Sequence, residues 1–186
     1  MTFTWTGHRF AGGALALDVA NSVVLRHHPD RRIDRYAEPA ALHAFSSAAN
    51  DFSAEAALLA PVDPLPAGNR DDFIALREAI DRHFRAVIEG LASSLTLADL
   101  LDAISATLRR YPTPGKRMPL DLATAHSALQ LLSQPQPDRL KICPNCGWLF
   151  LDRSRNRSRA WCDMAVCGNR MKASRHYRRR QAEASK

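Results

Sequence analysis

The residues best suited to chemistry are four cysteines, all within the last 44 residues: Cys143, Cys146, Cys162 and Cys167. Their spacing is C-x2-C-x15-C-x4-C, and the first pair, "CPNCG", has the composition of a zinc knuckle. Four thiolates without a histidine at the same spacing favour a closed tetrahedral Zn2+ site, which leaves no open position for a catalytic water. An iron–sulfur cluster or a C-x-x-C redox pair remains an alternative, although the other sequence cues for either are missing.

Arginine occupies every second position of the segment between the two cysteine pairs: Arg153, Arg155, Arg157 and Arg159. In an extended strand such residues face one side, about 6.6 Å apart, where they could contact a polyanion. We expect a hairpin whose strands are "GWLFLD" and "RSRAWC", with a turn between them. A solvated basic loop is the simpler alternative.

The turn prevents all four arginines from sharing one strand, so we expect some of them to be structural. Arg155 is expected to pair with Asp152 or Asp163, whereas Arg153 and Arg157 are freer to contact a ligand.

A basic helix is expected after the last cysteine, and its cationic residues lie on several faces: Arg170, Lys172, Arg175, Arg178, Arg179 and Arg180. Residues 141–186 contain twelve Lys and Arg against three acids, whereas residues 1–140 contain 14 bases against 16 acids. All of the basic excess is therefore C-terminal. This asymmetry indicates a nucleic-acid-binding module, or less favourably one for an anionic membrane surface.

The remaining chain must position this module, and its apolar spacing predicts a mainly helical domain over residues 1–135. We expect helices near 10–28, 34–60, 70–93 and 120–133, and another whose N-cap is Thr96. "QPQPD" is expected to act as a stiff linker. Residues 136–186 then form a small α+β finger of ββα type, too poor in apolar residues to fold without metal.

Asp18 and Asn21 are polar residues inside an apolar segment. The favoured interpretation is that Asp18 caps or hydrogen-bonds the start of a helix. The alternative is that the two side chains face a ligand pocket.

The first residues lack a secretory signal, and no apolar stretch approaches the roughly 20 residues of a membrane span, so we expect a cytoplasmic protein. Clustered cysteines are then metal ligands more often than disulfides. We find no Gly-rich phosphate loop and no catalytic dyad, and we expect no enzymatic activity.

The stretch "CPNCGWLFLDRSRNRSRAWCDMAVCGNRMKASRHYRRR" closely resembles the CGNR zinc finger, over essentially all of 141–182. "GALALDVANSV" is similar to the L-x-L-D-x-x-N-[ST] signature of the helical ABATE domain, with Asp18 and Asn21 at the matching positions. The resemblance implies a bacterial, stress-induced type of transcription regulator whose four cysteines hold zinc and whose finger binds DNA.

Two functions follow from these observations. The first is a zinc-dependent DNA-binding regulator in which Arg153, Arg157, Arg159 and the basic helix contact DNA, and the helical domain dimerises or senses a small-molecule effector. The second is a zinc-thiolate module for protein interaction or redox sensing without direct DNA readout.

Overall fold

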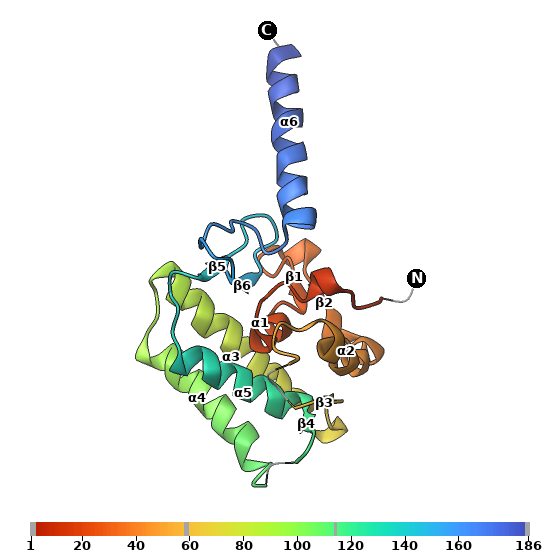
Figure 1. Cartoon of the computed structure of the whole chain (residues 1–186), viewed down its shortest axis with the longest axis vertical. Helices are drawn as coiled ribbons and strands as arrows, with labels where there is room; N and C mark the ends of the chain where they lie inside the picture. Colours follow the sequence, from red (N-terminus) through yellow and green to blue (C-terminus); the bar gives the residue numbers. More distant parts are fainter. Residues whose placement is uncertain (1–2, 58–59, 114, 185–186) are drawn as a thin grey trace.

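The computed structural model describes residues 3–57, 60–113 and 115–184, apart from the side chains at positions 175, 176, 179 and 182–184. A helical body carries one long helix, α6 (Asn169–Ala184), which projects away from it and ends at the C-terminal tip (Figure 1). The zinc-knuckle segment lies between the body and the root of this helix. Among the described residues, no helix is long and apolar enough to cross a membrane.

Three long helices form one side of the body: α3 (Arg70–Glu89), α4 (Ser94–Arg109) and α5 (Leu120–Ser133). The chain turns from α3 towards α4 at Gly90, whose φ of 70° is the left-handed conformation that favours glycine. The short helix α1 (Leu15–Ala20) packs against both α3 and α5. All six residues of α1 are buried, as expected of a helix that is apolar around most of its circumference.

Helix α2 (Pro39–Phe52) covers a second, aromatic part of the core. There the ring of Phe45 contacts Trp5, Phe10 and Tyr36 at centroid distances of 4.9, 5.0 and 5.4 Å. Trp5 Nε1 donates a 2.7 Å hydrogen bond to the carbonyl of Ala41, so its polar atom is satisfied inside the core.

In the part of the chain that the structure describes, three two-stranded sheets and several short helical turns connect these helices. The antiparallel pairs are β1 (Val23–Val24) with β2 (Ile33–Asp34) and β5 (Leu140–Ile142) with β6 (Leu149–Leu151), and β3 (Val62–Asp63) runs parallel to β4 (Met118–Pro119). The turns are η1 (Gly7–Arg9), η2 (Pro29–Arg31), η3 (Arg35–Ala37), η4 (Ala67–Asn69) and the π-helical turn η5 (Met164–Gly168).

The expected fold class is confirmed: a mainly helical N-terminal part precedes a small α+β finger. Three details were wrong. The helix expected over 10–28 has six residues, because Val23–Val24 pairs with β2 as a strand. Ser93, not Thr96, caps α4, and the two side chains form a reciprocal capping box. The segment 157–162 is not a strand, since β6 pairs instead with β5, which precedes the knuckle.

Candidate zinc centre and nucleic-acid interface

The first two cysteines lie in the turn that connects β5 to β6. The amide of Cys143 donates to the carbonyl of Trp148 at 2.8 Å, and the amide of Gly147 donates back to the carbonyl of Cys143 at 2.8 Å. Gly147 has a φ of 75°, which closes the turn without steric cost to a side chain. The turn therefore brings Cys143 and Cys146 to the same side of the hairpin.

The second pair is positioned by the π-helical turn η5. Asp163 caps this turn, because its Oδ1 accepts hydrogen bonds from the amides of Ala165 at 2.7 Å and Val166 at 3.1 Å. Gly168 lies close to the side chain of Met164, since a Cβ there would lie 2.7 Å from Met164 Sδ. The cap and the close packing set the direction in which the chain leaves Cys167 and enters α6.

The four cysteine sulfurs lie within 4.8 Å of one another. Cys162 Sγ is 3.5 Å from Cys146 Sγ and 3.6 Å from Cys167 Sγ. A tetrahedral Zn2+ with bonds of about 2.3 Å separates its sulfurs by about 3.8 Å, so the arrangement suits zinc. Asn145 Nδ2 donates to Cys167 Sγ at 3.3 Å, an outer hydrogen bond of the kind that orients metal ligands and that cysteine spacing alone could not reveal.

The thiols cannot all ionise at this separation without a cation. Hydrogen bonds from Cys146 and Cys162 lower the pKa of Cys143. The interaction with Cys143 in turn raises the pKa values of Cys146 and Cys162 far above their usual range. A divalent cation supplies the positive charge that lets four thiolates coexist, and its binding releases their protons.

The loop that follows β6 is organised around the buried carboxylate of Asp152. Its oxygens accept hydrogen bonds from Lys141 Nζ at 2.8 Å and from the amides of Ser154 and Arg159, each at 2.9 Å. Burial opposes ionisation of Asp152, but the hydrogen bonds from Lys141 and Ser154 outweigh it and hold the pKa well below its usual range. Lys141 Nζ also donates to the carbonyls of Arg157 and Arg159, so one ion pair fixes most of the loop.

The arginines of this loop are placed differently from our expectation. Arg153 Nε donates to the carbonyl of Gly13 at 2.6 Å, and Arg159 donates to the carbonyls of Ala11, Trp161 and Cys162. Both side chains therefore hold the finger together or tie it to the N-terminal segment.

The other two arginines of the loop, Arg155 and Arg157, are exposed, as is Arg153, but neither makes a hydrogen bond or ion pair with the described part of the N-terminal segment. Arg157, whose φ is 52°, pairs with Asp138 at 2.7 Å. Arg155 has no pairing with Asp152 or Asp163, or with any other residue that the structure describes. Of the four, Arg155 is therefore the one most available to a ligand.

Asn21 ties the finger to the helical body. Its Nδ2 donates to the carbonyl of Leu149 at 2.8 Å, and its Oδ1 accepts from the amide of Leu149 at 2.9 Å. Two residues along β6, the amide of Leu151 donates to the carbonyl of Gly12 at 2.7 Å. The edge of β6 opposite β5 is thus satisfied by the N-terminal segment, so the finger is bonded to the body in addition to its covalent linker.

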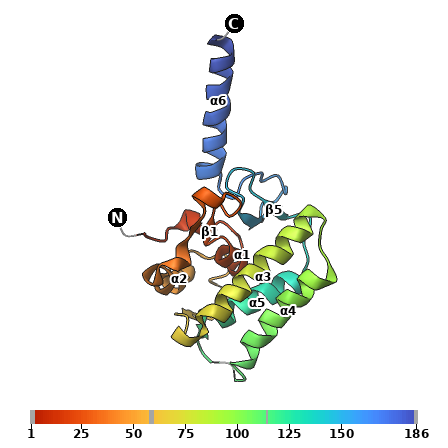
Figure 2. The same cartoon turned by 180° about the vertical axis from the view of Figure 1, so that it is seen from behind.

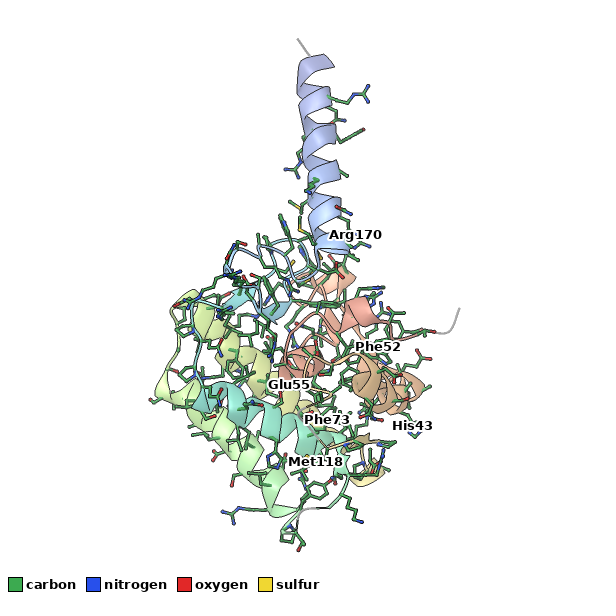
Figure 3. The ribbon with its side chains drawn as sticks, in the orientation of Figure 1. His43, Phe52, Glu55, Phe73, Met118 and Arg170 are labelled. Carbon is green, nitrogen blue, oxygen red and sulfur yellow. The ribbon has the colours of Figure 1, made fainter. Side chains whose placement is uncertain are left out.

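The buried side chain of Asp18 holds the same N-terminal segment. Its Oδ1 accepts from the amide of Gly12 at 2.8 Å, just before α1, in agreement with the hydrogen-bonding interpretation. Its Oδ2 is buried without a partner among the described residues, and burial raises its pKa well above the usual value. Glu55 lies beside α1 (Figure 3) and accepts from the amide of Leu15 at 2.8 Å and from Ser127 at 2.6 Å.

Helix α6 stands clear of the body in both opposite views (Figures 1 and 2). The structure shows exposed side chains at Arg170, Lys172, Arg178 and Arg180, and no ion pair joins any of these four to a described acid. The predictions for Arg175 and Arg179 fall on side chains outside the described residues. A stretch of exposed positive charge therefore extends from the zinc site outward.

Comparison with protein families gives two matches in N-to-C order. Residues 13–136 match the ABATE family, described as "Putative stress-induced transcription regulator", and residues 139–180 match the CGNR zinc finger. Comparison with curated proteins and with solved structures finds no match. Together with the four converging sulfurs, the finger match identifies zinc as the cofactor.

Proposed function

Because the chain belongs to the ABATE family and carries a CGNR zinc finger, we propose that it is a zinc-dependent transcription regulator that binds DNA directly. Residues 136–186 hold the zinc and contact DNA, with Cys143, Cys146, Cys162 and Cys167 as the metal ligands. Residues 1–135 form the part that senses an effector or dimerises.

The observation that carries this proposal is the projecting basic helix. Helix α6 has 16 residues and is therefore about 24 Å long. The major groove of DNA is about 12 Å wide and admits a helix, while cations on several faces of that helix reach the phosphates on both sides. An acid-poor surface of this kind is typical of nucleic-acid-binding proteins.

Zinc acts here as a structural ion. The ligand Cys167 lies two residues before α6, so the metal and the cap at Asp163 together set the direction in which the helix leaves the body. The side chains of the finger, and not the metal, supply the DNA contacts. Removal of zinc should therefore abolish binding without any change to the basic residues.

Fluorescence anisotropy of a labelled DNA duplex, titrated at several salt concentrations, tests the proposal. We expect the double variant Arg178→Gln/Arg180→Gln to lower the slope of log K against log salt by about 2. The matched control Arg82→Gln/Arg109→Gln removes two exposed arginines from the helical body and should leave the slope unchanged.

Affinity that does not depend on salt, or equal slopes for both double variants, would contradict DNA binding through α6. A chelator arm provides an independent check. The zinc-loaded protein should bind the duplex, and the same protein after chelation should not.

A further inference from the structure

Three arginines from separate parts of the chain meet at the root of α6. Arg9 lies in η1, Arg35 begins η3, and Arg170 lies in the first turn of α6, where Figure 3 labels it. The guanidinium carbons of Arg9 and Arg35 lie 5.6 and 4.2 Å from the ring centroid of Phe3, so they share one aromatic support. Arg9 and Arg170 also line a cavity of about 90 Å3 beside the cysteines, together with His8.

No acid in the described part of the chain forms an ion pair with these arginines. Among the described residues, neither Arg9 nor Arg35 has an ion pair, and the Nε of each is buried without an acceptor. The buried arginines of the body are different: Arg77 makes a bidentate pair with Asp34, and Arg85 pairs with Asp81. The buried guanidinium groups of Arg77 and Arg85 are thus neutralised by carboxylates, whereas those of Arg9 and Arg35 are not.

The electrostatics of the cluster are unfavourable in the free protein. Burial lowers the pKa of Arg9, and the positive charges of Arg35 and Arg170 lower it further. The one carboxylate at the cavity, Asp163, already accepts two backbone amides through Oδ1. A buried donor without an acceptor is unfavourable, and so is the repulsion between the guanidinium groups; an anion that accepts hydrogen bonds from them would relieve both penalties.

We propose that Arg9, Arg35 and Arg170 form a binding site for a phosphodiester group of the DNA backbone. Guanidinium groups suit this ligand because their planar set of donors matches phosphate oxygens. The inference rests on the proposed function and extends it: the helical N-terminal domain touches DNA together with the finger. Phosphate contacts fix register and orientation, so the cluster would determine how α6 meets the duplex.

The first test compares charge removal at the cluster with charge removal elsewhere. The variant Arg9→Met/Arg35→Met keeps an apolar stem over Phe3, and Arg82→Met/Arg109→Met is the matched control. With a labelled 30-base-pair duplex, we expect the cluster variant to lower the salt slope by about 0.9, the value for loss of one phosphate contact. Equal slopes in the two variants, at equal zinc content and equal unfolding midpoint, would overturn the proposal.

The second test does not depend on variants. The Nε–Hε NMR signals of Arg9 and Arg35 are followed in the zinc-loaded full chain during titration with the duplex and, separately, with inorganic phosphate. Shifts with both ligands support a DNA phosphate site. Shifts with phosphate alone, while the duplex binds elsewhere, would overturn the DNA assignment and leave a free-anion site.

The outcomes also separate this inference from the proposed function. If the wild type fails to bind the duplex at every salt concentration, DNA binding fails, whatever the cluster does with phosphate. If the duplex binds but neither arginine signal shifts, the proposed function stands and the phosphate site is overturned.

Discussion

Asn21 offers the sharpest test of how the body holds the finger. It is 3% exposed, and its side-chain amide makes two hydrogen bonds to the backbone of the fully buried Leu149. Asn21→Ala removes both partners at once. The amide and carbonyl of Leu149, the first residue of β6, then stay buried without a hydrogen-bond partner.

The magnitude follows from those two groups. Each unsatisfied buried backbone group costs about 1–3 kcal/mol, so we expect Asn21→Ala to lower the free energy of unfolding by roughly 2–6 kcal/mol. Since typical domains have only about 5–15 kcal/mol in total, this loss is large. Because β6 directly follows the zinc knuckle, zinc should also pass more quickly to a competing chelator.

Urea unfolding of the zinc-loaded chain and the rate of zinc transfer to a colorimetric chelator measure the two effects. Asn50→Ala is the matched control, since Asn50 makes the same paired contact with Val62 at 2.9 and 2.8 Å but is exposed and far from the cysteines in sequence. Asn50→Ala should lower the free energy of unfolding by about 1 kcal/mol and leave the rate of zinc transfer unchanged. Asn21→Asp keeps only the hydrogen-bond acceptor and places a carboxylate against the Leu149 carbonyl. At pH 7 its free energy of unfolding should therefore be no higher than that of Asn21→Ala.

A change below about 0.5 kcal/mol for Asn21→Ala, within the range of ordinary surface substitutions, would refute the reasoning. So would zinc transfer that is equal in Asn21→Ala and Asn50→Ala. In either case the finger would be held by its apolar contacts and its linker, without need of the amide.

Three further predictions concern single side chains. Gly13→Ala should cost at least about 2 kcal/mol in urea unfolding, because φ there is +78° and the new Cβ would lie 2.8 Å from the Leu151 carbonyl, whereas Gly68→Ala meets open space and should be nearly neutral. Burial lowers the pKa of His83 in the folded protein, so below about pH 6.5 the unfolded chain binds more protons than the folded chain. The free energy of unfolding should therefore fall as the pH falls through this range. His83→Gln should remove that part of the pH dependence. Asp152→Asn should lower the free energy of unfolding by about 3 kcal/mol at pH 7. Because the pKa of Asp152 is depressed in the folded protein, this difference from the wild type should persist above about pH 4 and shrink below it.

The local features of the sequence predict much of this protein. The spacing of apolar residues marks α3 because only one face of that helix is apolar, and the pattern can be read from the sequence alone. The cysteine spacing marks the metal site for the same reason, since each pair lies within a single turn. The excess of basic residues after position 140 is likewise evident from the sequence alone.

Other features depend on residues that meet only in the folded chain. Asn21 and Leu149 are 128 positions apart, and β6 takes as its partner the segment before the knuckle, not the arginine segment after it. The roles of the arginines also follow from long-range acceptors: Arg153 meets the carbonyl of Gly13, whereas Arg155 meets no described partner. Charge composition and cysteine spacing by themselves determined that the C-terminal part is basic and carries a metal site. Tertiary structure decided which cations are structural and which remain free, because a guanidinium group is engaged only by the acceptors that packing places within its reach.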